Sequence, residues 1–188
     1  MRTFIAIDLD EKLKTILRNY ILDLASTRTK VRWVKPEGMH LTLKFLGEIN
    51  QTQADQVIKE LQNITEHYTP FPLDLVGTGT FPPKSRHPKV IWIGLPRDPQ
   101  LVTLAQEIEN KMTKLGFPAE KREFAPHLTL GRVKNQAGIN NLLVKLNEKQ
   151  NYHFGGMIVK KITFFKSILK PTGAEYIPLQ EFEFPCFT

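Results

Sequence analysis

One four-residue string occurs twice in this chain of 188 residues, as His40-Leu41-Thr42-Leu43 and as His127-Leu128-Thr129-Leu130. Each copy follows a proline and a turn-rich stretch, and helical periodicity is found on both sides of each copy. The repetition predicts two related halves, each with strands and helices. Many strand connections are too short for parallel crossovers. We therefore expect an α+β fold: two pseudo-symmetric lobes of mainly antiparallel sheet, with outer helices and a cleft between the lobes.

Apolar periodicity predicts the elements around the two copies. Period-two patterns indicate strands, and stripes of 3.6-residue period indicate helices. The predicted strands cover 2–9, 30–35, 40–45, 71–75, 89–95, 124–133, 157–169 and 175–179, with a turn at 171–173. The predicted helices follow Asp10, cover the region of 54–64, follow Asp98, and cover 139–146. No polar linker separates the halves, so we expect one domain, 1–188, whose lobes (approximately 1–95 and 96–188) do not fold independently.

The repeated string places polar and apolar side chains on opposite faces of a strand. Leu41 and Leu43 can enter the core while His40 and Thr42 face outward, and the second copy repeats this pattern. If a pseudo-two-fold axis relates the halves, two histidines and two threonines converge on one ligand. A histidine on an amphipathic strand is, however, more often an ordinary surface or core residue, so the pattern alone leaves a non-catalytic interpretation open.

Such a quartet suits chemistry at phosphorus. A neutral imidazole can take a proton from water, and a protonated imidazole can give one to a leaving oxygen. In-line attack needs this base and this acid on opposite sides of the phosphorus. Threonine hydroxyls add hydrogen bonds to the non-bridging oxygens, where charge develops. Two facing copies of one motif supply this arrangement without a metal ion.

The charge balance favours an anionic partner. Lys and Arg number 26 against 19 Asp and Glu, a net charge of +7 with no block of five or six like charges. The chain has one cysteine and no run of about 18 apolar residues. It also lacks the cysteine clusters of structural zinc sites. We therefore expect a cytoplasmic protein with no cofactor, no metal and no membrane partner.

Several segments, in order along the chain, resemble one known family. The first signature is 33–47, WVKPEGMHLTLKFLG, and the second is 124–132, FAPHLTLGR. Residues 2–7 resemble the family's first strand, 81–82 with 88–94 its middle segment, and 167–176 its closing hairpin. The family is the 2H phosphoesterases, and within it the RNA 2′,3′-cyclic phosphodiesterase branch, also called 2′-5′ RNA ligases. The match spans nearly the whole chain. A departure is Gly131, where many relatives carry alanine.

The resemblance implies hydrolysis of a terminal 2′,3′-cyclic phosphate of RNA to a 2′-phosphate, with a weak reverse reaction that joins RNA ends by a 2′-5′ bond. It implies that His40 is the proton donor to the leaving oxygen and that His127 is the proton acceptor from water. RNA with cyclic phosphate ends, including tRNA fragments, is the implied partner of a monomeric protein.

Thr42, Thr129 and Arg132 are the candidate substrate-binding residues. Strict alternation points Arg132 away from the face of His127. A bulge near Gly131 would turn the guanidinium back toward the phosphate.

Weaker candidates lie near the two signatures. Lys44 is expected on the face of His40, where it would meet the phosphate or be an ordinary exposed lysine. Tyr176 and Phe45 are candidates to stack on a base, although a core position is the more frequent case for Phe45. The cations of the loop before residue 90 are candidates for backbone phosphate contacts; they are Lys84, Arg86 and Lys89.

Two alternative functions remain open from the sequence. One is a non-catalytic module that binds RNA ends, and the other is a 2H phosphodiesterase acting on small cyclic nucleotides or on 2′-5′ linkages. Both histidines and both threonines are intact, which favours an enzyme because binding alone does not need a second imidazole.

Overall fold

The computed structural model describes residues 1–170 and 173–186, so Pro171 and Thr172 of the predicted turn lie outside the described residues. The helices are α1 (Glu11–Ala25), the short 3₁₀ helix η1 (Pro36–Gly38), α2 (Gln51–Thr65), α3 (Pro99–Lys114) and α4 (Ile139–Glu148). The strands are β1 (Arg2–Asp8), β2 (Val31–Trp33), β3 (His40–Glu48), β4 (Phe71–Val76), β5 (Thr78–Phe81), β6 (Val90–Gly94), β7 (His127–Val133), β8 (His153–Val159), β9 (Lys161–Lys170) and β10 (Gly173–Glu183).

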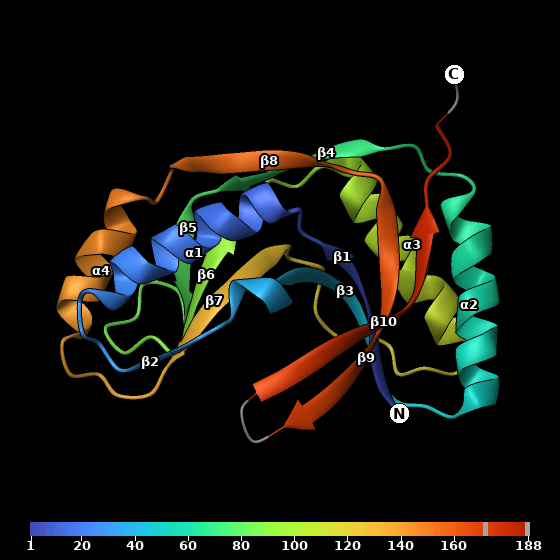
Figure 1. The fold of residues 1–188 in the computed structure, drawn as a ribbon, viewed down its shortest axis with the longest axis horizontal. Helices are drawn as coiled ribbons and strands as arrows, with labels where there is room; N and C mark the ends of the chain where they lie inside the picture. The colour runs from blue at the N-terminus through green and yellow to red at the C-terminus, as the bar shows by residue number, and fades with distance from the viewer. Residues whose placement is uncertain (171–172, 187–188) are drawn as a thin grey trace.

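Two four-stranded antiparallel sheets form the body of the molecule (Figure 1). The first sheet has the order β10-β9-β1-β3, the second has the order β2-β7-β6-β5, and β4 pairs with β8 in a separate ribbon. Each four-stranded sheet takes strands from both halves of the chain, because β9 pairs with β1 and β6 pairs with β7. The expected α+β class with antiparallel sheets is confirmed.

The helices also cross between the lobes. The helix that follows β1, α1, packs beside α4, whereas α3, which follows β6, packs beside α2 and against β3. Figure 1 shows α1 with α4 at one end of the molecule and α2 with α3 at the other. One large hydrophobic cluster includes buried residues of all four α-helices and of both four-stranded sheets. Both halves of the chain therefore share one core, in agreement with the absence of a polar linker between them.

Local sequence explains where the helices begin. The Asp10 side chain accepts a hydrogen bond of 2.8 Å from the Leu13 amide at the start of α1. Asn50 and Gln53 form a reciprocal capping box at α2. At α3 the Asp98 carboxylate accepts from two amides, directly before Pro99 at the first helical position. These caps satisfy amides that have no partner within the helix.

The strand predictions differ from the structure at several points, of which β10, longer than the predicted 175–179, is one. The apolar run predicted as one strand, 157–169, belongs to two strands: β8 pairs with β4 up to Val159, and β9 begins at Lys161 and pairs with β1 over Thr163 to Lys166. β5 was not predicted, and β7 begins at His127 and not at Phe124. The break falls at Lys160, and the pair Lys160-Lys161 in an otherwise mostly apolar run was the available signal for it. No helix in the described parts of the chain is long and apolar enough to cross a membrane.

Candidate active site

Each copy of the repeated string opens a strand: β3 begins at His40 and β7 begins at His127. The two leucines of each copy are buried, whereas both histidines and both threonines are half-buried. The alternation predicted for the two strings is therefore confirmed. β3 and β7 belong to different sheets but lie against each other in the middle of the fold, as Figure 1 shows. The fold thus places the two strings on contacting strands of different sheets.

A bulge lies at the last residue of the repeated string in β3. The pairing of β1 with β3 slips between Ile5 and Ala6, so that Leu43 has no partner on β1. Leu43 and Lys44 are both buried, and the next residue, Phe45, is 65% exposed. The Phe45 ring lies 6.0 Å from that of Phe4, which also stacks on His40. The bulge therefore places Phe45 on the face of His40; the expected core position for Phe45 is wrong.

The same bulge recurs in β7. The pairing of β6 with β7 slips between Ile91 and Trp92, so that Leu130 has no partner on β6. Leu130 and Gly131 are buried and Arg132 is exposed. A bulge near Gly131 is therefore present, and Arg132 occupies the position in β7 that Phe45 occupies in β3.

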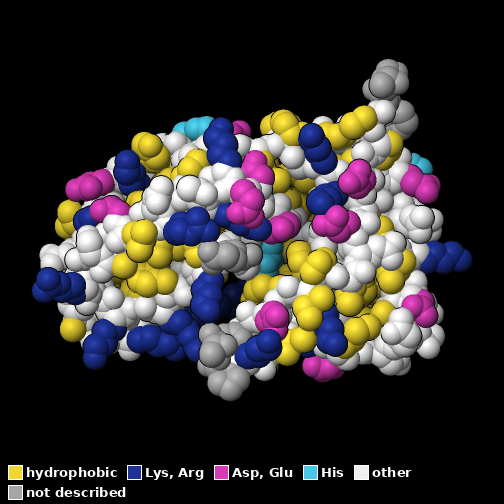
Figure 2. Space-filling view, viewed as in Figure 1, with side chains coloured by type: hydrophobic (Ala, Val, Ile, Leu, Met, Phe, Trp, Pro, Cys, Tyr) yellow, Lys and Arg dark blue, Asp and Glu magenta, His cyan; other side chains and the backbone are white. Residues whose placement is uncertain are grey.

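Aromatic rings enclose His40. Its imidazole stacks on Phe4 with centroids 4.6 Å apart and meets the edge of Tyr176 at 4.8 Å, and Phe165 lies 5.8 Å away. Figure 2 shows a hollow near the middle of this face with a histidine beside it. A pocket of about 160 Å³ opens beside the ring. Its lining residues are Asp8, Gly38, His40, Phe165, Tyr176, Pro178 and Glu181.

This enclosure sets the protonation state of His40. Burial lowers the pKa of the His40 imidazole to about 4, because a charged ring loses its hydration among apolar neighbours. A hydrogen bond with the Gly38 backbone and the charge of Asp8 raise the pKa, whereas Lys14 lowers it further. The Lys14 ammonium lies 3.1 Å from the Asp8 carboxylate, which limits the effect of Asp8. His40 is therefore neutral at pH 7 in the unliganded protein.

His127 is held differently. Its Nδ1 lies 2.8 Å from the Ala125 carbonyl oxygen. A carbonyl can only accept, so Nδ1 carries the proton, and Nε2 of the neutral ring is left as a proton acceptor. The Phe81 ring meets His127 edge-on at 5.2 Å. This orientation suits a base.

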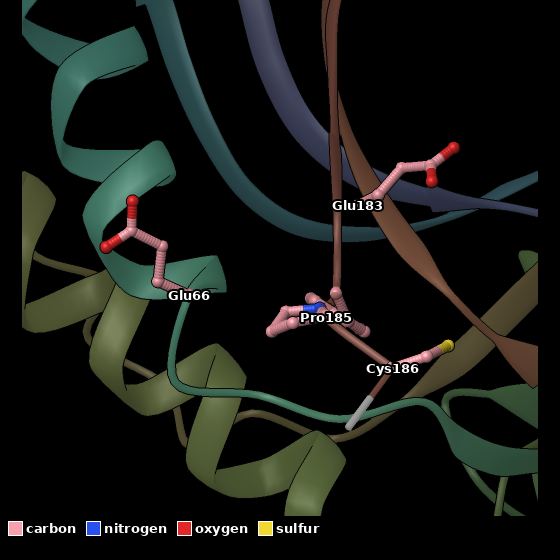
Figure 3. Close-up of a pocket in the computed structure, with 5 residues that line it drawn as sticks. Glu66, Glu183, Pro185 and Cys186 are labelled. Atoms are coloured by element: carbon pink, nitrogen blue, oxygen red, sulfur yellow. The ribbon is translucent and has the colours of Figure 1, made fainter. Parts of the chain in front are cut away.

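A larger hollow lies elsewhere, at the end of β10 beside the end of α2 (Figure 3). It has a volume of about 620 Å³, and its lining residues are Glu66, Glu183, Phe184, Pro185 and Cys186. It shares no residue with the pocket of His40. Among the described residues, no three His, Cys, Asp or Glu side chains gather closely enough to hold a metal ion.

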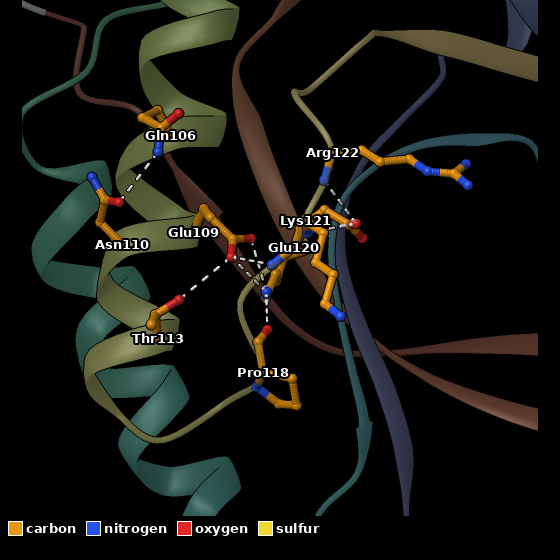
Figure 4. Close-up of polar contacts among 9 residues, drawn as sticks. Gln106, Glu109, Asn110, Thr113, Pro118, Glu120, Lys121 and Arg122 are labelled. Atoms are coloured by element: carbon orange, nitrogen blue, oxygen red, sulfur yellow. Dashed lines mark hydrogen bonds and ion pairs between the residues drawn. The ribbon is translucent and has the colours of Figure 1, made fainter.

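Lys44 does not lie on the face of His40, so that expectation is wrong. Its side chain is 5% exposed, and its Nζ lies 2.9 Å and 2.8 Å from the two carboxylate oxygens of Glu109 and donates to the Pro118 carbonyl at 2.6 Å. Glu109 also accepts from the Glu120 amide at 2.8 Å (Figure 4). The bulge at Leu43 is the cause, because it turns Lys44 inward toward α3.

Gly131 has a packing role in this chain. A Cβ at this position would lie 2.6 Å from Val31 Cγ1 and 2.9 Å from the Trp33 ring. Glycine therefore lets the Val31 and Trp33 side chains of β2 pack closely on β7, and an alanine here would require these side chains to shift.

Sequence reasoning missed Phe4 and Phe165, which form a small apolar cluster under His40. Phe4 alternates with the core residue Ile5 on β1, and this was the available signal for a second buried face. The loop cations Lys84, Arg86 and Lys89 are exposed. No polar contact ties their side chains to either histidine in the described residues.

The model of the LigT-like phosphoesterases matches this chain twice, over residues 7–92 and 93–176. The protein belongs to that family, within the 2H superfamily. The RNA 2′,3′-cyclic phosphodiesterase of Methanothermobacter thermautotrophicus is 32% identical over 182 residues, covering 97% of this chain and 98% of the relative. The protein of the same name from Methanocaldococcus jannaschii is 35% identical over 181 residues, covering 96% and 99%.

Solved structures agree. A Thermus thermophilus protein has a TM-score of 0.82 at 27% identity, with 97% of both chains covered. Escherichia coli LigT, solved with 3′-AMP, has a TM-score of 0.77 at 23% identity, again with 97% of both chains covered, and shares the fold.

Proposed function

We propose that this protein hydrolyses the terminal 2′,3′-cyclic phosphate of RNA to a 2′-phosphate. The observation that carries the proposal is the pair of bulged strands, β3 and β7, which start at His40 and His127 and meet between the two sheets. Each strand presents a histidine and a threonine on one face. Relatives that span the same length are named for this activity.

In the proposed reaction, water attacks the phosphorus of the cyclic ester. The Nε2 of His127 takes the water proton, the bond from phosphorus to the 3′ oxygen breaks, and His40 gives a proton to that oxygen. The product keeps the phosphate on the 2′ oxygen. Each proton transfer is worth roughly 10²–10⁴ in rate. The weak reverse chemistry follows when a 5′ hydroxyl of a second RNA attacks the phosphorus in place of water, which joins the two ends by a 2′-5′ bond.

His40 must gain its proton before it can donate. Its pKa of about 4 belongs to the unliganded pocket. An anionic phosphate beside the ring favours the charged imidazole and raises the pKa. Substrate binding would therefore both protonate His40 and bring the leaving 3′ oxygen next to its ring.

The remaining residues bind the substrate in this proposal. Thr42 and Thr129 donate to the non-bridging oxygens of the cyclic phosphate, and Arg132, turned onto their face, neutralises charge on the phosphates of the bound strand. Tyr176 closes the pocket of His40, and Phe45 offers an exposed ring for a base.

The wider setting is part of the proposal. The substrates are RNAs with cyclic phosphate ends, including tRNA fragments, and the protein acts as a monomer in the cytoplasm without a metal ion. It works as one domain of two repeat-related halves, approximately 1–95 and 96–188. The sheets support a single domain, because each four-stranded sheet contains strands from both halves of the chain.

The test is turnover of a short RNA that ends in a 2′,3′-cyclic phosphate, with ³¹P NMR to locate the product phosphate. The expected product is the 2′-phosphate. The double variant His40→Ala/His127→Ala serves as the blank. If wild type and blank behave alike but both bind the RNA, the protein is a binding module and the proposed function is wrong.

A further inference from the structure

Two arginines stand directly opposite each other beside the candidate site. Arg32 of β2 is paired in register with Arg132 of β7, and both side chains are exposed. Neither has an ion-pair partner in the described residues. Like charges directly opposite on paired strands destabilise a sheet. The chain holds this unfavourable pair on the rim of the site, where an anion would relieve the repulsion.

The pairing continues one step outward with two lysines. The Lys134 amide donates to the Lys30 carbonyl at 2.8 Å, and both side chains are exposed. Lys30 directly precedes β2 and Lys134 directly follows β7. Each lysine is two residues from an arginine, and the backbone hydrogen bond between the two lysines extends the pairing of β2 with β7 by one step, so the four cations follow one alternation. They form two rungs separated by about 6.6–6.8 Å. We call Lys30, Arg32, Arg132 and Lys134 the cationic ladder.

The ladder lies on the side of the sheet that carries the motif. Val31 and Trp33 cover Gly131 on the buried side, so Arg32, between them, points the other way. Arg132 is turned onto the face of His127 by the bulge. Figure 2 shows Lys and Arg side chains gathered along the edge of the hollow over the region where β2 and β7 lie in Figure 1.

We propose that the cationic ladder binds two successive phosphates of an RNA strand, upstream of the nucleotide whose cyclic phosphate lies between the histidines. This inference rests on the proposed function and narrows its substrate class to oligonucleotides. The rung spacing matches the repeat of an extended nucleotide strand. Each arginine can bind phosphate oxygens through two parallel N–H donors, and each lysine adds a point charge.

The chain geometry connects the ladder to the chemistry. Five residues separate His127 from Arg132 along β7, a distance of no more than about 17 Å. An extended strand that leaves the histidines therefore reaches the Arg32–Arg132 rung within two or three nucleotides and the lysine rung one nucleotide later. Contacts to phosphates carry no base information, so the ladder would select for length and not for sequence.

The experiment compares a 2′,3′-cyclic mononucleotide with a trinucleotide and a tetranucleotide that end in the same cyclic phosphate. For wild type, kcat/KM should be higher for the oligomers, and its logarithm should fall with log salt by roughly 0.7 per phosphate contact. In Arg32→Gln the oligomer slope should decrease by about 0.7, and in Lys30→Gln/Arg32→Gln by about 1.4. The oligomer kcat/KM of Arg32→Gln should drop roughly tenfold at low salt.

The matched control is Lys59→Gln, which removes one exposed cation from α2. It should leave both slopes unchanged. A melting measurement adds an independent readout: Arg32→Gln should melt at the same or a higher temperature, because one of two repelling charges is gone.

The outcomes separate the two proposals. If no substrate is hydrolysed, the proposed function fails. If the mononucleotide and the oligomers show equal salt slopes, or if Arg32→Gln lowers kcat/KM for all substrates alike, the ladder is overturned while the hydrolytic function stands, and small cyclic nucleotides become the substrate class.

Discussion

Lys44 Nζ of β3 lies 2.8 Å from Glu109 Oε2 of α3, and this pair links the strand of the first motif to the chain that leads into the second. The same carboxylate accepts from the Glu120 amide, and Lys44 donates to the Pro118 carbonyl. Residues 118–120 lie on the connection between α3 and His127. The buried Lys44 ammonium therefore connects β3, which carries His40, with the segment that leads to His127.

Replacing Glu109 with Gln should lower the free energy of unfolding by about 2–3 kcal/mol, because it leaves the buried Lys44 charge without its counter-ion. Urea unfolding measures this loss. The control is Lys161→Met, which breaks the half-exposed pair of Lys161 with Glu181, 2.7 Å apart, and should cost less than about 1 kcal/mol. Equal losses in the two variants would mean that Lys44 is not held mainly by Glu109.

That ion pair should also shape the stability in acid. Burial alone would raise the pKa of Glu109, but the hydrogen bonds from Lys44 and from the Glu120 amide outweigh it and lower the pKa. The stabilisation is thus fully present above the usual glutamate pKa of 4.5 and is lost as the pH falls further. The stability difference between wild type and Glu109→Gln should be constant above about pH 5 and shrink below about pH 4.5. A difference that does not change with pH would contradict this assignment.

His40 should give a separate pH dependence at higher pH. Its pKa is about 4 in the folded protein and about 6.5 when unfolded, so the unfolded state binds the proton first. Stability should fall as the pH decreases from about 6.5 to about 4, by on the order of 3 kcal/mol in total. In His40→Phe this part of the curve should be flat. Denaturant unfolding at stepped pH measures both, and a parallel decline in the variant would refute a buried neutral His40.

Ligand binding should reverse this shift if His40 is the proton donor. NMR titration of the His40 ring with and without a nucleoside 2′-monophosphate, the product of a cyclic mononucleotide, should show a higher His40 pKa in the complex. The phosphate charge favours the imidazolium. His127→Ala serves as the control that keeps the His40 pocket intact. A His40 pKa that stays near 4 in the complex would assign the acid role to His127 and the base role to His40.

Each histidine should be essential for turnover. His40→Ala and His127→Ala should each lose on the order of 10²-fold or more in kcat, because each removes one proton-transfer group. Circular dichroism and melting should confirm that both variants fold. Near wild-type turnover in either variant would rule out a mechanism with two histidines.

Turnover should persist in EDTA, since the proposed reaction moves protons between imidazoles, water and the leaving oxygen. The measurement compares the rate of dialysed, chelator-treated protein with that of protein given Mg²⁺, Mn²⁺ or Zn²⁺. Loss of the rate in EDTA with recovery on adding one ion would replace the proposed mechanism with a metal-assisted one.

The sequence by itself determined the features that depend on local pattern. Alternation along a strand is a property of the backbone, so the burial of Leu41 and Leu43 and the outward placement of His40 and Thr42 followed from the string alone. The repetition of that string likewise predicted two related halves. The helix starts at Asp10 and Asp98 followed from short-range hydrogen bonding of the caps.

Contacts between segments that are distant in the sequence determined the remaining features of the site. The bulges at Leu43 and Leu130 exist because neighbouring strands slip in register; Gly131 suggested the second bulge from the sequence, and no residue of β3 indicated the first. They turned Lys44 into the core and Phe45 onto the face of the site. The low pKa of His40 arises because Phe165, far away along the chain, and its neighbours exclude water. The opposition of Arg32 and Arg132 is likewise a matter of register between distant strands, which only the folded sheet determines.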